Sequence, residues 1–131
     1  MGKIRVLLAD DHETILERTK AVLGGEFEIV ASVKNGQDAF LETQRLDPDV
    51  LVIDISMPVL DGLQAARQLR SKKSRTRIVF LTVHGDEDFI TAAFAAGASG
   101  YVTKSRVTTD LVPAIRDALA GRKYISESVL R

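Results

Sequence analysis

The 131-residue sequence contains no cysteine, and its 18 basic and 18 acidic residues leave no net charge. Without cysteine the chain has no disulfide framework, no thiolate metal site and no cysteine nucleophile, which fits a reducing compartment. We therefore expect a cytoplasmic protein. Without a basic surplus the chain lacks the charge with which nucleic-acid-binding domains displace counterions from phosphates, so we expect no nucleic-acid binding by this chain.

Long apolar runs and glycine-rich phosphate loops are also lacking. No apolar run approaches the ~20 residues of a membrane-spanning helix, so we expect no membrane partner. The absence of a phosphate-binding glycine loop argues against a dinucleotide-binding protein or an NTPase. What remains is ordinary globular composition, 45% hydrophobic and 27% charged, at a length that suits one domain.

Short apolar runs rich in β-branched residues alternate with amphipathic stretches. The runs are too short for helices and predict strands. The first, third and fourth are almost unbroken, as in parallel strands covered on both faces, whereas the second and fifth carry polar residues and should be edges. The predicted strands are 4–9, 27–33, 50–53, 78–81 and 101–102.

Apolar positions at helical spacing lie between and after these strands and predict five helices. Together they indicate an α/β fold with a doubly wound, five-stranded parallel sheet of order 2-1-3-4-5, as in flavodoxin. In such a sheet ligands bind beyond the carboxyl ends of the strands, where the winding reverses. The helices are expected around 15–23, 39–46, 62–70, 89–94 and 111–119.

Three carboxylates follow the two strands at that reversal point: Asp10 and Asp11 after the first, and Asp54 after the third. Asp10 or Asp11 taken alone could equally cap the next helix, with Glu13 completing a capping box. Three clustered carboxylates repel one another unless a cation holds them. All-oxygen ligation suits Mg²⁺, so we expect Mg²⁺ as the cofactor.

Thr82 ends the fourth strand and Lys104 the fifth. Alone, each is an ordinary strand-end residue. With the carboxylates they predict a site that handles a phosphoryl group, with Asp54 as the nucleophile and Lys104 and a metal ion neutralising its oxygens. Neither histidine has a zinc-like spacing to a second ligand, so His12 and His84 are expected to be exposed loop residues.

These residues together resemble the receiver domain of two-component response regulators, over nearly the whole chain to about Gly121. Single matches are weak, but the set lies at four strand ends in the right order. It comprises Asp10, Asp11, Asp54, Met57, Pro58, Asp61, Gly62, Thr82, Tyr101 and Lys104.

The resemblance implies a role for each matching position. Asp54 would accept a phosphoryl group from a sensor histidine kinase, and Lys104 would pair with the phosphoryl oxygens. Thr82 and Tyr101 would form the switch pair. Mg²⁺ would be bound directly by Asp11, Asp54 and the backbone carbonyl of Ser56, with Asp10 acting through water. Such a domain is a self-phosphorylating switch rather than a conventional enzyme.

The switched surface would be helix 89–94, strand 101–102 and helix 111–119, controlling dimerisation and an output domain. The segments Leu81–Val83 and Gly121–Ser126 resemble the NarL/FixJ (LuxR-type) group, in which a helix-turn-helix domain follows the receiver. The chain is either a stand-alone receiver or a piece of a longer protein, and we expect the latter: a receiver at 1–121 and, at 122–131, the start of a linker toward a missing C-terminal DNA-binding domain. Many receivers have a cis proline after the lysine; here Ser105 follows, and we predict a trans bond.

Three alternatives stay open at this point. A receiver-like module could bind partners independently of phosphorylation. A phosphatase of the haloacid dehalogenase type would need an aspartate two residues after the nucleophile, where this chain has Ser56. A flavodoxin would need a hydroxyl-rich loop after the first strand, whereas residues 10–13 are mainly acidic and would repel a phosphate.

Overall fold

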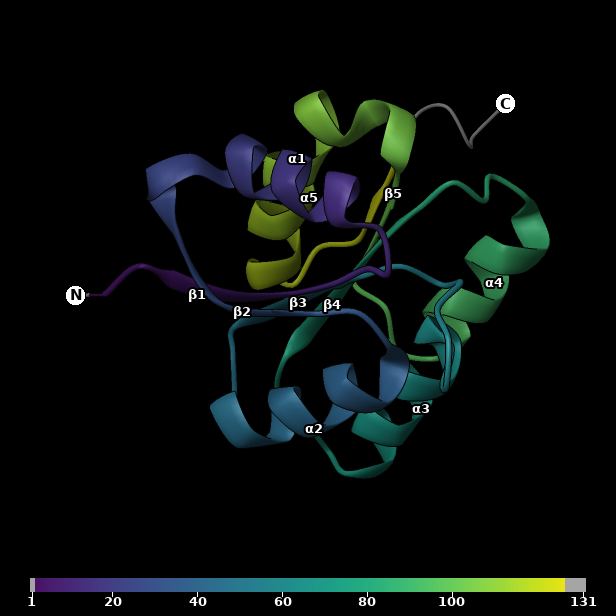
Figure 1. The fold of residues 1–131 in the computed structure, drawn as a ribbon. Coiled ribbons are helices and arrows are strands. Elements are labelled where there is room, and N and C mark those ends of the chain that lie inside the picture. Colours follow the sequence, from purple (N-terminus) through teal and green to yellow (C-terminus); the bar gives the residue numbers. More distant parts are fainter. Residues whose placement is uncertain (1, 127–131) are drawn as a thin grey trace.

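The computed structural model describes residues 2–126, which form a parallel sheet covered by helices on both faces (Figure 1). Expectations for residues 127–131 lie outside this range. The strands are β1 (Ile4–Ala9), β2 (Phe27–Val33), β3 (Val50–Ile53), β4 (Arg77–Thr82), β5 (Gly100–Thr103) and β6 (Tyr124–Ile125). The helices are α1 (Glu13–Leu23), α2 (Gly36–Leu46), α3 (Gly62–Ser71), α4 (Glu87–Ala95) and α5 (Val107–Leu119), with short 3₁₀ turns η1 (Gly24–Glu26) and η2 (Lys104–Arg106).

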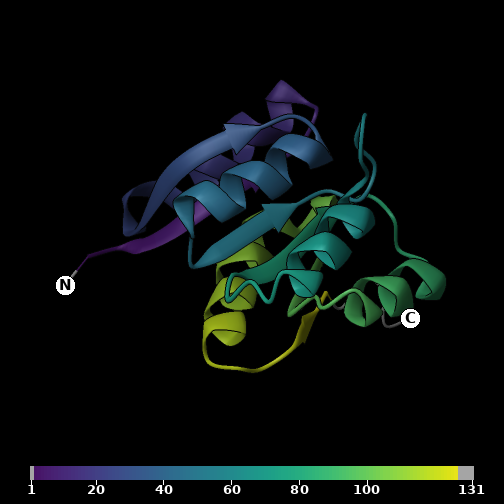
Figure 2. The same cartoon turned by 90° about the horizontal axis from the view of Figure 1, so that it is seen from below.

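The sheet separates two hydrophobic clusters because alternate strand residues point to opposite faces. Leu7, Leu51 and Phe80 pack on the side of α2, α3 and α4. Val52 and Val79 pack on the side of α1 and α5. Figure 2 shows the same two layers of helices from below. All four residues of β3 are buried, which agrees with its unbroken apolar sequence.

The strand order is β2-β1-β3-β4-β5-β6, and every neighbouring pair is parallel. The doubly wound fold, its five helices and the order of the first five strands are confirmed. The prediction of five strands, with the fifth as an edge, is wrong. Tyr124 and Ile125 pair with Gly100 and Tyr101. A strand of two residues is too short to show a periodic pattern in the sequence. It forms where the chain meets the open edge of β5. The division of the chain at residue 121 stays a prediction.

In the β5–α5 connection, the start of α5 differs from the prediction and one peptide bond agrees with it. α5 begins at Val107, a turn earlier than the apolar pattern indicated, because polar residues 108–110 belong to its first turn. Among residues 2–126 no peptide bond is cis, so the predicted trans bond between Lys104 and Ser105 is confirmed.

None of the helices within residues 2–126 combines the length and apolarity needed to cross a membrane.

Candidate phosphoryl-group site

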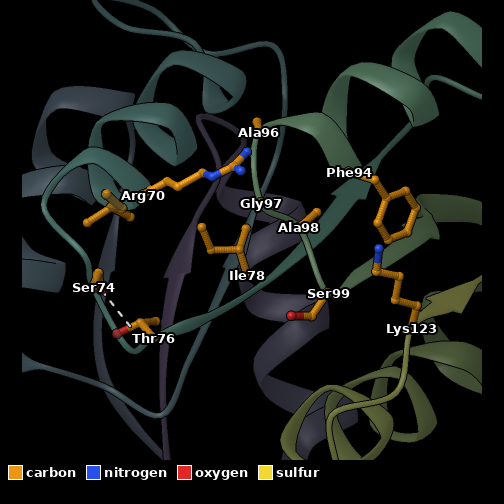
Figure 3. A pocket seen from close by; sticks show the side chains of 11 residues that line it. Arg70, Ser74, Thr76, Ile78, Phe94, Ala96, Gly97, Ala98, Ser99 and Lys123 are labelled. Carbon is orange, nitrogen blue, oxygen red and sulfur yellow. Dashed lines mark hydrogen bonds between the residues drawn. The ribbon is translucent and has the colours of Figure 1, made fainter.

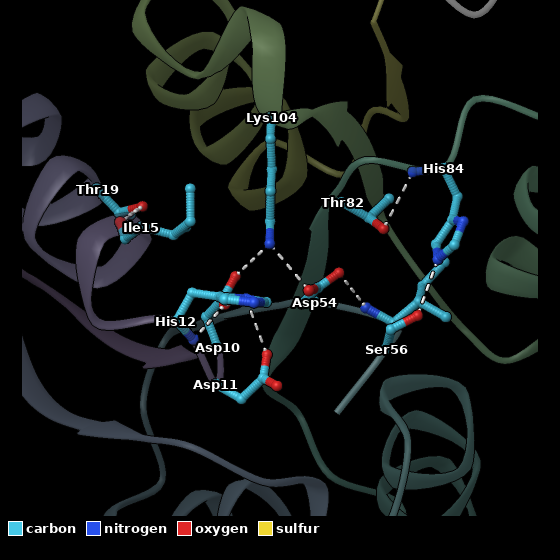
Figure 4. Close-up of polar contacts among 11 residues, drawn as sticks. Asp10, Asp11, His12, Ile15, Thr19, Asp54, Ser56, Thr82, His84 and Lys104 are labelled. Atoms are coloured by element: carbon cyan, nitrogen blue, oxygen red, sulfur yellow. Dashed lines mark hydrogen bonds and ion pairs between the residues drawn. The ribbon is translucent and has the colours of Figure 1, made fainter. Parts of the chain in front are cut away.

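Four strands deliver side chains to one point at the carboxyl edge of the sheet (Figure 4). Asp10 follows β1, Asp54 follows β3, Thr82 ends β4, and Lys104 follows β5. The backbone N–H of Asp54 donates a 3.0 Å hydrogen bond to the carbonyl of Ala9, which extends the β1–β3 pairing to the site. Asp10, Asp54 and Thr82 are buried. The structure therefore brings the predicted residues together, although their roles stay predictions.

Lys104 is the cation that balances the two buried carboxylates. Its Nζ lies 2.8 Å from Oδ2 of Asp10 and 2.9 Å from Oδ2 of Asp54. Burial alone would lower the pKa of Lys104, but the hydrogen bonds and charges of Asp10 and Asp54 outweigh burial, and the pKa is raised. The lysine is thus held charged, with its ammonium pointing at a carboxylate oxygen of Asp54, the predicted phosphoacceptor.

Asp10, Asp11, His12 and Asp54 each offer one ligand atom within 4.8 Å of the others. Three of the four are carboxylates, the hard oxygen donors that suit Mg²⁺, so the residues fit the predicted ion. The part played by the backbone carbonyl of Ser56 stays a prediction. His12 was not predicted to lie at the site, but its Nδ1 is 3.1 Å from Oδ1 of Asp11. Its position directly after the two aspartates was the available signal.

The capping interpretation of Asp10 and Asp11 is wrong. The N-cap residue of α1 is His12, and no side chain caps that helix. Oδ1 of Asp10 instead accepts a 2.9 Å hydrogen bond from the N–H of His12. This turn directs the second carboxylate oxygen of Asp10 to Lys104, so the residue belongs to the site and not to the helix end.

Tyr101 lies beneath the loop that follows β4. It is fully buried, and its hydroxyl donates a 2.7 Å hydrogen bond to the carbonyl of His84. Burial, reinforced by the negative charges of Asp86 and Asp54, raises the pKa of Tyr101 to about 12. Oγ1 of Thr82 accepts a long 3.4 Å hydrogen bond from the N–H of the same His84. His84 therefore connects the two residues of the predicted switch pair.

The His84 side chain joins the loop after β4 to the loop after β3. Its Nε2 is hydrogen-bonded to Oγ of Ser56 at 2.8 Å, and its ring stacks on Phe89 of α4 with 4.2 Å between ring centres. Sequence spacing could not indicate this pair, because 28 residues separate its members. His12 is an exposed loop residue, as predicted; His84 also lies in a loop, but it is partly buried rather than exposed.

The loop between Asp54 and α3 is held by a close backbone approach. Asp61 caps α3 by accepting a 2.8 Å hydrogen bond from the N–H of Gln64. The N–H of Gly62 donates to the carbonyl of Ile55 at 2.7 Å. A Cβ atom on Gly62 would overlap the carbonyl oxygen of Asp54. Glycine at this position therefore lets the loop close directly behind the predicted phosphoacceptor.

Comparison with known proteins agrees with this geometry. Residues 6–116 match the family model described as response regulator receiver domain. The chain is 33% identical to the transcriptional regulatory protein DegU of Brevibacillus brevis over 98% of its own length and 55% of that protein. It is 32% identical to the nitrate/nitrite response regulator protein NarL of Escherichia coli K12, over 95% and 58% respectively.

A solved structure, a LuxR-family two-component response regulator from Aurantimonas sp. SI85-9A1, has a TM-score of 0.92. Its sequence is 34% identical to this chain, and the superposition covers 98% of this chain and 94% of the solved one. The chain spans a little over half the length of the two curated relatives just named. The match over most of the chain shows that it belongs to the response regulator receiver domain family, in the NarL/LuxR-type group.

Proposed function

We propose that this chain is a phosphorylation switch in which Asp54 accepts a phosphoryl group from a sensor histidine kinase. The observation that carries the proposal is the double contact of Lys104 Nζ with the buried carboxylates of Asp10 and Asp54, 2.8 and 2.9 Å away. Receiver domains are phospho-accepting switches rather than conventional enzymes, and this constellation supports the same role here.

In the proposed reaction an oxygen of Asp54 attacks phosphorus. The bond between phosphorus and the kinase histidine breaks as the Asp54–phosphorus bond forms. Lys104 moves its hydrogen bond from the carboxylate to a phosphoryl oxygen, and the hydroxyl of Thr82 donates to another. These donors stabilise negative charge that spreads over the phosphoryl oxygens.

A divalent cation fits the acidic end of the site. Asp11 and Asp54, with Asp10 through water and the carbonyl of Ser56, would hold Mg²⁺. When bound, Mg²⁺ supplies positive charge that neutralises the transferring phosphoryl group. Asp11 is exposed, whereas Asp10 and Asp54 are buried. A metal ion would therefore enter and leave the site on the side of Asp11.

The output proceeds through the loop between β4 and α4. When the hydroxyl of Thr82 turns toward the phosphoryl group, its hydrogen bond with the N–H of His84 changes. The carbonyl of the same His84 accepts the hydrogen bond from Tyr101. The surface of α4, β5 and α5 would respond and control dimerisation and an output domain. DegU is named as a transcriptional regulatory protein, which supports transcription as this output.

The test is phosphorylation by a small acyl-phosphate donor with Mg²⁺, followed by intact-mass spectrometry. We expect the wild-type protein to gain the mass of one phosphoryl group and Asp54→Asn to gain none. Chelating the metal should abolish the gain in the wild type. Asp38→Asn, which changes an exposed aspartate at the start of α2, is the matched control and should be labelled normally.

An unchanged wild-type mass would contradict the proposal and favour the alternative, an interaction module that does not depend on phosphorylation. Equal labelling of Asp54→Asn would place the phosphoryl group elsewhere.

A further inference from the structure

The residue after β6 is tied to the sheet by both its backbone and its side chain. Ser126 is fully buried. Its N–H donates a 2.8 Å hydrogen bond to the carbonyl of Tyr101, and its Oγ accepts a 3.2 Å hydrogen bond from the N–H of Thr103. A serine hydroxyl can also donate once. Here it donates to Oδ2 of Asp110 at 2.8 Å.

Asp110 lies in the first turn of α5 and is buried. Besides Ser126, it accepts hydrogen bonds of 2.9 Å from Nε of Arg106 and from the hydroxyl of Thr109. Burial opposes its charge, but the hydrogen bonds from Arg106, Ser126 and Thr109 outweigh burial and hold the pKa of Asp110 below its ordinary value. A buried carboxylate with three donors is a rigid anchor, because losing a donor leaves charge unsatisfied.

These contacts enclose the turn that carries Lys104. The turn η2 begins at Lys104 and ends at Arg106. The hydroxyl of Ser126 holds Thr103 on one side of it, and through Asp110 it holds Arg106 on the other side. The ammonium of Lys104 projects from this turn to Asp54. Ser126 is therefore connected, through one short turn, to the lysine that contacts the predicted phosphoacceptor.

The tail that ends in Ser126, from Lys123 onward, is also anchored on the opposite side of β5. Nζ of Lys123 lies 5.3 Å from the centre of the Phe94 ring in α4, a cation–π contact. The two residues line a cavity of about 390 Å³ at the other edge of the sheet (Figure 3). The tail from Lys123 to Ser126 thus crosses between α4 and α5 along β5, which keeps Ser126 in register with Tyr101 and Thr103.

We propose that Ser126 is a positioning residue for phosphorylation of Asp54, because it fixes the η2 turn that presents Lys104 to the phosphoryl group. The inference rests on the proposed function. It places a residue beyond the expected receiver boundary at residue 121 within the phosphorylation machinery, although Ser126 touches no reacting atom.

The test compares phosphorylation rates of the full 131-residue chain with a small acyl-phosphate donor and Mg²⁺. We expect Ser126→Ala to lower the rate about tenfold or more, since misplacing a positioned group by about 1 Å can cost up to about 100-fold. Mg²⁺ affinity, measured by calorimetry without the donor, should be unchanged or tighter, because none of the proposed metal ligands lies on η2.

Asp117→Asn is the matched control. Asp117 lies on the same helix as Asp110 and pairs at the surface with Arg122, the residue just before the tail. This variant should be phosphorylated at the wild-type rate. Should Ser126→Ala fail to fold in a denaturation assay, Asp110→Asn keeps the shape of the anchor, weakens its hold on Arg106 and is expected to slow phosphorylation in the same way.

The possible failures are distinguishable. A wild-type chain that is not phosphorylated contradicts the proposed function itself. A normally phosphorylated wild type with an equally fast Ser126→Ala overturns only the positioning role. A slow Ser126→Ala that also binds Mg²⁺ more weakly, or a control that is equally slow, indicates general loosening of the fold and overturns it too.

Discussion

The hydroxyl of Ser56 and Nε2 of His84 lie 2.8 Å apart, so that one hydrogen bond joins the loop after β3 to the loop after β4. Figure 4 shows this hydrogen-bonded pair on one side of Asp54. In the proposed phosphorylated state these two side chains would lie beside the carboxylate that carries the phosphoryl group. We therefore expect the pair to influence how long that state lasts.

Replacing Ser56 or His84 by alanine should shorten the lifetime of the phosphoryl group. A hydrogen bond of this kind contributes about 1 kcal/mol, or roughly a fivefold change in rate. The double variant should match the single ones, because each change breaks the same bond. Loss of phosphoryl mass over time after removal of the donor measures the lifetime. A longer lifetime in His84→Ala would mean instead that the imidazole activates the attacking water.

Val59, in the loop between Asp54 and α3, has a φ of 70° and is 81% exposed. The left-handed conformation costs an L-residue about 1–2 kcal/mol, and glycine avoids that cost but loses more entropy on folding. Val59→Gly should therefore raise the free energy of unfolding by up to about 1 kcal/mol. Val83→Gly, also exposed but without positive φ, should lower it. Urea denaturation distinguishes the two, and a destabilised Val59→Gly would contradict the strain argument.

Tyr101 should ionise later than a free tyrosine, since its pKa is raised from 10.0 to about 12. A raised pKa means that the folded state favours the neutral phenol. That stabilisation is complete below pH 10 and is lost as the pH rises toward 12. Absorbance titration should show a phase near pH 12 that Tyr101→Phe lacks. The stability advantage of the wild type over Tyr101→Phe should narrow across the same window. A Tyr101 phase near pH 10 would contradict its burial.

Lys104→Met should destabilise the fold, because it leaves the buried carboxylates of Asp10 and Asp54 facing each other without a cation. Removing one partner of a buried ion pair costs about 3–5 kcal/mol. Added Mg²⁺ should restore part of this stability by binding the folded state. Denaturation with and without Mg²⁺ measures both effects. Lys34→Met, which breaks the exposed contact with Glu13, is the control and should cost less than about 1 kcal/mol. Equal losses for both variants would mean that Lys104 is not essential to the charge balance.

The order of the first five strands could be predicted because apolar density differs between covered and edge strands. The fifth strand was the exception. Its polar ends indicated an edge, whereas β6 covers it through only two residue pairs. Such a short strand depends on tertiary contacts. Ser126, the residue directly after β6, is held by hydrogen bonds with Asp110 and Thr103 and not by any local sequence pattern.

The gathering of Asp10, Asp54, Thr82 and Lys104 follows from the strand pattern alone, because parallel strands bring their carboxyl ends to one edge and all four residues stand at such ends. Which of them bond to one another, and what surrounds them, depends on three-dimensional packing. The Ser56–His84 bridge, the choice of His12 over Asp10 as helix cap, and the anchoring of Ser126 join residues by side-chain reach and burial. Those depend on distances across the sheet, and sequence spacing does not encode them.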